Sequence, residues 1–157
     1  MATGEASDPL VCAGANKPTP DDDGVLTALE VGDLDLSGVE LAVLSACETG
    51  LGEVAGGDGV LGLQRALLLA GARATVTSLW QVPDAATSAL MARFYGNRFT
   101  KGLGPLEALR EAQLWLLNEG VKEERNADGG ALVKLAGKGR CTPPVYWAAF
   151  TLAGDWR

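Results

Sequence analysis

The 157-residue sequence contains no histidine, and this absence limits the chemistry that is open to it. The usual zinc ligand sets need histidine or several close cysteines. The three cysteines, Cys12, Cys47 and Cys141, are odd in number and far apart in the chain. They suggest neither a metal site nor a disulfide framework. We therefore expect reduced thiols and no bound metal.

Positive charge and long apolar runs are also scarce. Thirteen Lys and Arg face twenty Asp and Glu, so the formal net charge is −7. Phosphate recognition depends on clustered Lys and Arg, and the one local cluster, Lys134, Lys138 and Arg140, is typical of a solvated loop. No apolar run approaches the roughly 20 residues that span a bilayer, and the start resembles no signal peptide. We expect a cytoplasmic protein that binds neither nucleic acid nor membrane.

The order of apolar and glycine-rich segments predicts an α/β fold. Residues 1–24 are loop-like, with "NKPTPDDDG" as an exposed lead-in, and a helical turn or two precede Gly32. Three segments predict strands and three predict helices, which favours a largely parallel sheet. The strand segments are "LAVLSA" (41–46), "ARATVTSLW" (72–80) and "VYWAAFTLAG" (145–154). The first helix segment is "VLGLQRALLLAG", with Gly71 as its C-cap, and the third is "GPLEALREAQLWLLNEG". The second begins with Pro83 and Asp84, and its apolar face consists of Ala86, Leu90, Met91 and Phe94.

The predicted sheet is short of strands. Sheets of this class usually have about five or six, and residues 119–144 are expected to be a long connection without one. The run 41–46 is apolar on both faces, so it should have a neighbour on each side. Residues 74–79 can supply one neighbour. The other is expected to be missing from this chain.

Cys47 lies where the first predicted strand meets a glycine-rich loop, "CETGLGEVAGGDG". Three interpretations stay open from position alone: a buried core thiol, a nucleotide-binding loop, or a nucleophile. The spacing of Gly50, Gly52 and Gly56 is a weak nucleotide signal, and Glu48 and Glu53 within the loop would repel a pyrophosphate. We therefore expect no cofactor.

Several motifs together resemble the CHAT domain, a caspase-like module that is often found with tetratricopeptide repeats. They are "SACETG", "GDGVLGLQRALLLAGARATVTSLWQVPD", "GPLEALREAQLWLL" and "YWAAFTLAGDWR". The resemblance implies a clan CD cysteine peptidase related to caspases and separase, with a three-layer sandwich and a mostly parallel sheet. It covers residues 25–157 as the C-terminal part of such a domain, with a variable connection near 119–144.

The resemblance implies a Cys–His dyad in which Cys47 is the nucleophile, and the amides of Cys47 and Gly50 are candidates for the oxyanion site. The family's His-Gly pair, normally on a neighbouring upstream strand, has no match here. The early strands are therefore expected to be missing, with the histidine supplied by an upstream segment or a partner chain. Alone, the chain should be inactive. The alternatives are a non-catalytic interaction module and a truncated gene fragment.

Trp80 and Asp84 follow the second predicted strand, and each has two interpretations. Both can line the pocket of a protein or peptide substrate. Trp80 can equally serve aromatic packing, and Asp84 can equally be a helix N-cap. Trp147 and Phe150 favour the core rather than a site.

Overall fold

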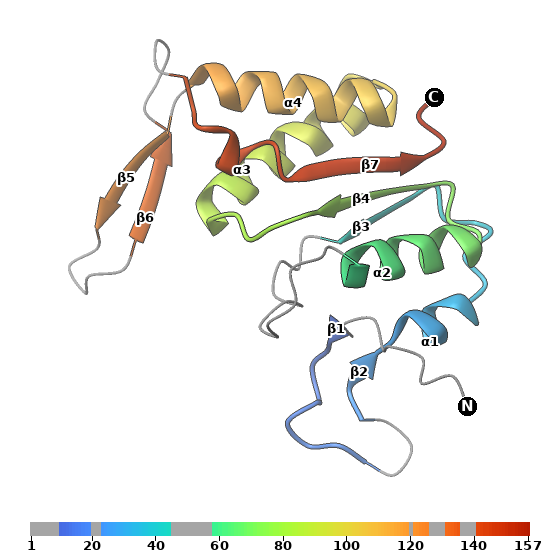
Figure 1. The fold of residues 1–157 in the computed structure, drawn as a ribbon. Coiled ribbons are helices and arrows are strands. Elements are labelled where there is room, and N and C mark those ends of the chain that lie inside the picture. Colours follow the sequence, from blue (N-terminus) through green and yellow to red (C-terminus); the bar gives the residue numbers. More distant parts are fainter. Residues whose placement is uncertain (1–9, 20–22, 45–57, 120, 126–130, 136–140) are drawn as a thin grey trace. The chain divides into compact units, whose positions relative to one another are not determined.

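The computed structural model divides the chain into two compact units, Met1–Leu79 and Trp80–Arg157. Figure 1 shows the helices and strands of both units, coloured along the sequence. At 58–61, 121–125 and 131–135 it describes the backbone alone. The described residues are 10–19, 23–44, 58–119, 121–125, 131–135 and 141–157.

The first unit is built on a pair of parallel strands. Its elements are β1 (Leu10–Val11), β2 (Val25–Leu26), α1 (Ala28–Gly32), β3 (Leu41–Leu44), α2 (Asp58–Leu69) and β4 (Ala74–Ser78). β3 pairs in parallel with β4, and Leu44 lies opposite Thr77. Helix α2 packs against β4, and α1 packs against α2. Strands predicted at 41–46 and 72–80 are found at 41–44 and 74–78, and the helix between them is confirmed. Residues 45 and 46 lie outside the described residues.

Apolar side chains from helices and strands form the core of this unit. Leu63, Ala66 and Leu67 are buried at i, i+3 and i+4 of α2, which is the spacing of one helix face. Val31 of α1 is 1% exposed and joins the same cluster. Ala42 and Leu44 of β3 pack against it from the sheet. Ala42 and Leu44 are two residues apart, so they lie on the one face of β3 that meets this cluster.

Residues 10–11 lie in the stretch that was expected to be loop, but they form β1. Leu10 pairs with Leu26 in an antiparallel register, and Cys12 donates its amide to the carbonyl of Gly24 at 2.8 Å. Leu10 is half-buried against the core of the unit. The expectation was wrong for these two residues because burial of one leucine outweighs the surrounding turn-forming residues.

Helix α2 ends at a glycine, as predicted. Gly71 has φ of +111°, and its amide donates to Leu68 O while the amide of Ala72 donates to Leu67 O. These two bonds form a Schellman motif, which satisfies carbonyls at the helix end. A Cβ at Gly71 would lie 2.8 Å from the backbone nitrogen of Ser37. The position therefore requires glycine both for its dihedral angle and for its close approach to a neighbouring turn.

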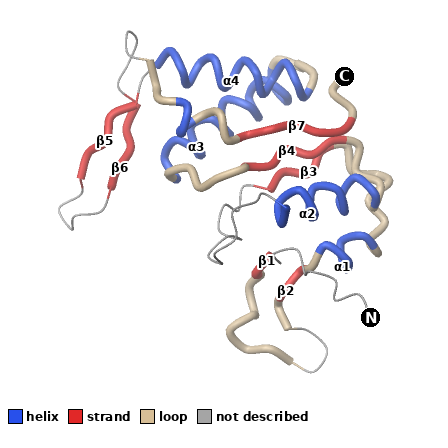
Figure 2. Tube along the Cα trace, in the orientation of Figure 1, coloured by secondary structure: helices blue, strands red, loops and turns tan. Residues whose placement is uncertain are grey.

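The second unit contains two long helices and the remaining strands (Figure 2). Its elements are α3 (Asp84–Tyr95), the π-helix η1 (Gly96–Thr100), α4 (Pro105–Glu119), β5 (Val121–Arg125), β6 (Ala131–Leu135), the 3₁₀ helix η2 (Pro144–Tyr146) and β7 (Phe150–Gly154). The predicted apolar face of α3 is confirmed, because Ala86, Leu90, Met91 and Phe94 are all buried. Helix α4 packs against α3 and buries Ala108, Leu109, Ala112 and Leu116.

A polar network lies beside this apolar packing. Arg93 of α3 holds Glu111 of α4 through two guanidinium nitrogens, and its Nε donates to Oε2 at 2.9 Å. Asn97 is fully buried and donates to Ala108 O and to Glu111. Lys101 Nζ donates to Asn97 Oδ1 at 2.8 Å. The hydrogen bond from Arg93 is the main cause that lowers the pKa of Glu111 to about 2.

Three predictions for the second unit need correction. Asp84 is not the N-cap of α3: Pro83 is, and its carbonyl accepts the amides of Ala86 and Thr87. Pro83 has the non-helical dihedral angles that an N-cap needs (φ −54°, ψ 136°), so the first residue of the helix is Asp84. The closing strand begins at Phe150 rather than 145, because Pro144 starts a 3₁₀ turn.

The connection at 119–144 was also expected to lack strands, and it contains an antiparallel pair. Val121 of β5 lies opposite Leu135 of β6, and Arg125 lies opposite Ala131. Its charged residues hid the pattern, because "VKEER" reads as a solvated segment. Helices and strands mix along the chain, so the α/β class is confirmed. Every helix in the described part is too short or too polar to cross a bilayer.

Replacing Gly71 should destabilise the chain, since Gly71→Ala adds a Cβ at a positive φ and against the Ser37 backbone. We expect the free energy of unfolding to fall by about 2 kcal/mol or more in urea titrations. Gly38→Ala is the matched control, because a Cβ there meets nothing within 4 Å. Equal losses in both variants would contradict the role given to Gly71.

Replacing Glu111 should give a pH-dependent loss of stability. The folded-state pKa is lowered to about 2 from an ordinary 4.5, so the stabilisation is complete above about pH 4.5 and is lost as the pH falls toward 2. Because both side chains are about a third exposed, we expect Glu111→Gln to cost about 1 kcal/mol at pH 7.

The stability difference between Glu111→Gln and the parent should therefore shrink in urea titrations between pH 4.5 and 2. The exposed Glu107 on the same helix gives the control, and Glu107→Gln should change stability by less than about 0.5 kcal/mol. A difference for Glu111→Gln that does not change with pH would rule out the ion pair as its cause.

Candidate functional site

The candidate nucleophile follows the carboxyl end of β3 in the sequence, and β3 pairs in parallel with β4. Parallel strands end at the same edge, and ligands of open α/β sheets bind beside that edge. β3 ends at Leu44 and α2 begins at Asp58. Cys47 and Gly50 belong to the segment between them, 45–57, which lies outside the described residues. The structure therefore places both flanks of that segment in the first unit.

Buried polar side chains lie along β4, and two of them, Thr77 and Ser78, are at its carboxyl end. Thr75, Thr77 and Ser78 are at most 2% exposed, although the strand has apolar neighbours. Gln64 of α2 is 8% exposed, and its Nε2 donates to Thr77 Oγ1 at 3.1 Å. This pair was not predicted from the sequence. The available signal was one glutamine on an otherwise apolar helix face, "LQRALL", and threonines two residues apart in a buried strand.

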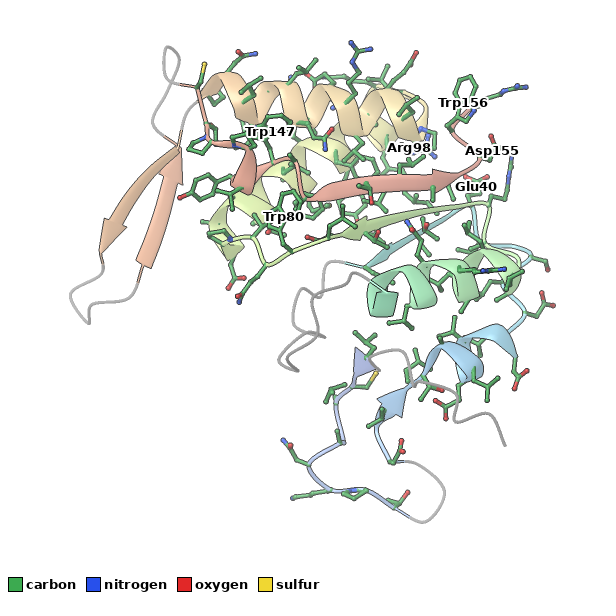
Figure 3. The ribbon with its side chains drawn as sticks, in the orientation of Figure 1. Glu40, Trp80, Arg98, Trp147, Asp155 and Trp156 are labelled. Atoms are coloured by element: carbon green, nitrogen blue, oxygen red, sulfur yellow. The ribbon has the colours of Figure 1, made fainter. Side chains whose placement is uncertain are left out.

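Trp80 lies in the segment between β4 and α3 (Figure 3), and one edge of its indole makes a hydrogen bond. Its Nε1 donates to the carbonyl of Val145 at 2.9 Å, and the side chain is 39% exposed. The indole therefore connects this segment to η2, and the residue remains partly exposed. This arrangement suits a fixed wall at the surface of the second unit.

Asp84 is the first residue of α3 and is exposed. Because Pro83 is the N-cap, Asp84 lies in the first turn of the helix. An acid in the first turn is still favoured by the helix dipole. Asp84 and Trp80 thus both belong to the surface of the second unit, four residues apart in one short segment.

The other singled-out residues have structural contacts. Phe150 is 2% exposed, as expected for the core, and Trp147 is half-buried and donates its Nε1 to Thr142 O at 3.0 Å. Cys12 and Cys141 are free and exposed. Within the described ranges, no group of three or more Asp, Glu, Cys or His side chains is arranged to hold a metal ion.

Comparison with known proteins gives one family. The CHAT domain family matches residues 5–155. Tetratricopeptide repeat protein 28 of Mus musculus is 35% identical over 131 residues, which are 83% of this chain and 4% of that protein. Tetratricopeptide repeat protein 28 of Homo sapiens is 42% identical over 88 residues, which are 56% of this chain and 3% of that protein. This chain thus spans a few per cent of the length of these relatives. Since the family match extends over most of the sequence, the chain belongs to the CHAT domain family.

Proposed function

We propose that this chain carries the nucleophile of a caspase-like cysteine peptidase, Cys47, and that the histidine of the dyad comes from sequence outside these 157 residues. The observation that carries the proposal is the parallel pair β3–β4, which leads the chain into the Cys47 segment at the carboxyl edge. Membership of the CHAT domain family supports it. Because the sequence contains no histidine, the dyad proposed here needs a histidine from another source.

The edge of β3 supports a location for the missing half. All four residues of β3 are half-buried, and in the described part of the chain the strand pairs with β4 alone. An apolar strand with an unpaired edge invites a further strand. We propose that a histidine-bearing strand, from an upstream segment or a partner chain, pairs there. The complete domain would then be a three-layer sandwich with a mostly parallel sheet.

The proposed chemistry needs a base beside the thiol. The histidine would take the proton from Cys47 Sγ, and the thiolate would attack the peptide carbonyl to form a tetrahedral oxyanion held by the amides of Cys47 and Gly50. The imidazolium would then protonate the leaving amine, and water would hydrolyse the thioester. A free thiol has a pKa of about 8.5, so only a few per cent is thiolate at pH 7.

The acids of the loop are poor substitutes for a histidine. Glu48 is adjacent to Cys47 in the sequence, and a nearby negative charge disfavours the thiolate. A carboxylate of ordinary pKa is a weak base, and near neutral pH it holds no proton for the leaving amine. We therefore propose that the chain alone is inactive.

The substrate in this proposal is a protein or peptide, and Trp80 and Asp84 contribute to its pocket. The indole is held at Nε1 and is partly exposed, so it can form one wall of the pocket. The Asp84 carboxylate is exposed at the start of α3, where it can accept a hydrogen bond from a substrate.

One observation favours a second candidate, a non-catalytic interaction module that keeps the fold without the dyad. The whole sequence lacks a histidine, and the acids near Cys47 do not replace it. A truncated gene fragment is the third candidate. An interaction module should fold stably without a partner strand, whereas a fragment with an open β3 edge should aggregate.

The decisive prediction is a requirement for both Cys47 and an external histidine. We expect no peptide cleavage by the purified chain alone. Addition of a histidine-bearing upstream segment from a longer CHAT protein should raise cleavage by about 10²- to 10⁴-fold, the usual contribution of general acid–base catalysis. Fluorogenic peptide hydrolysis measures both rates.

Cys47→Ala should abolish the restored cleavage, and Cys141→Ala, at an exposed free thiol, should leave it unchanged. Cleavage by the chain alone that is lost in Cys47→Ala would contradict the need for an external histidine. Cleavage that never depends on Cys47 would instead favour the interaction module.

A further inference from the structure

Two aromatic side chains are exposed where α3 continues into the π-helix η1. Phe99 is 77% exposed and Tyr95 is 38% exposed, and their rings stack with centroids 6.1 Å apart and an interplanar angle of 17°. Ala92, Tyr95 and Phe99 follow one another at i, i+3 and i+7, so they lie along one side of the helix, and all three are exposed. We call these three residues the aromatic face.

The aromatic face is held in place by the buried side of the same helix. The Tyr95 ring packs against the ring of Phe94, which is fully buried, with centroids 5.3 Å apart. Asn97 precedes Phe99 by two residues, is also fully buried, and donates its Nδ2 to Ala108 O of α4 at 3.1 Å. The backbone beside Phe99 is therefore anchored to α4, and a partner that packs on the rings meets a preformed surface.

The stability of the fold does not account for Phe99. An apolar side chain stabilises a fold through the area that it buries, and this ring is mostly exposed. Single exposed apolar residues are common and need no explanation, but here a second ring is stacked on the first and is itself packed against the core. Aromatic side chains are enriched among the residues that dominate the affinity of protein interfaces. The stacked pair therefore has the properties of a contact surface.

The sequence that carries the aromatic face is basic, although the chain is acidic. Residues 85–106 contain Arg93, Arg98 and Lys101 and no Asp or Glu, whereas the whole chain has a net charge of −7. Glu111 of α4 forms ion pairs with Arg93 and Lys101 and offsets one of these three charges. Arg98 adjoins the aromatic face in the sequence, and the side chain of Lys101 is 49% exposed. A net positive charge therefore remains around the aromatic face.

The two units differ in charge in the same sense. Met1–Leu79 contains three Lys or Arg and twelve Asp or Glu, whereas Trp80–Arg157 contains ten Lys or Arg and eight Asp or Glu. The unit that bears the aromatic face is thus the basic part of an acidic protein. Charge across an interface is arranged to be complementary, so a partner for this surface should be acidic.

We propose that the aromatic face docks an acidic segment of another protein that carries at least one apolar side chain. The apolar side chain would pack on the stacked rings of Tyr95 and Phe99, and carboxylates of the segment would lie beside Arg98 and Lys101. Complementary charge speeds the encounter and disfavours basic partners. The proposal does not depend on Cys47, and it holds for a peptidase and for a non-catalytic module alike.

The test is selection of a displayed random peptide library on the full 157-residue chain, followed by fluorescence anisotropy with labelled copies of the selected peptides. We expect selected peptides to combine Asp or Glu with Leu, Phe or Trp. Their binding should weaken when the salt concentration is raised from about 0.05 to about 0.5 M, because salt screens exposed charges. Versions of the same peptides with Lys in place of each acid should not bind.

A pair of matched variants assigns the binding to the aromatic face. Phe99→Ser should weaken it about tenfold or more, as expected for loss of an aromatic anchor. Leu69→Ser is the control, because Leu69 of α2 is 75% exposed and lies in the other unit. It should leave the affinity unchanged. Urea titrations should show that both variants keep the stability of the parent, since neither side chain is buried.

Three results would overturn the proposal. The first is a selection that yields no peptides, or peptides without an excess of acids. The second is equal binding by Phe99→Ser and the parent, and the salt dependence of the parent tests the charge requirement without any variant. The third is self-association of the chain in sedimentation experiments that Phe99→Ser abolishes, since the occupant would then be a second copy. Each of these results would leave the Cys47 proposal standing, and a failure of Cys47-dependent cleavage would leave the docking result standing.

Discussion

The parallel register of β3 and β4 is the constraint on which the account of this chain depends. It places Leu44 opposite Thr77, so the two strands end together and the Cys47 segment begins beside the end of β4. The apolar face of α2 covers the same side of the pair, with Leu44 and Ala42 packed against Leu63 and Leu67. Burial of those side chains holds the register, because a shift of one residue would turn Leu44 away from the core. Gln64 adds one directional contact to that packing.

The chain belongs to the CHAT domain family, but its sequence contains no histidine. The family resemblance implies a Cys–His dyad, and only the cysteine is encoded in these residues. The half-buried β3, paired in the described residues with β4 alone, suits a domain whose sheet continues in other sequence. The relatives are many times longer than this chain and are named for tetratricopeptide repeats.

Strong apolar periodicity made most of the fold predictable, and the failures have physical causes. The buried face of α3 and the glycine end of α2 followed from side-chain spacing and from the φ that Gly71 adopts. The β5–β6 pair was missed because charge masks strand pattern, and Asp84 was assigned a cap that the preceding proline provides. Cys47 was predicted from its motif and lies outside the described residues. The contact of Gln64 was not predicted, since a contact across 13 residues of sequence has no local pattern.

The central claim is that Cys47 is a nucleophile that lacks its base, and the pH dependence of its alkylation tests this most directly. Cys12→Ser and Cys141→Ser would remove the two exposed thiols and isolate the signal. The account predicts an apparent pKa for Cys47 at or above about 8.5 in the chain alone, because Glu48 disfavours the thiolate and no imidazolium stabilises it. The pKa should fall when a histidine-bearing CHAT segment is added. An apparent pKa well below 8.5 in the chain alone would contradict the claim, since the thiol would then be activated without a histidine.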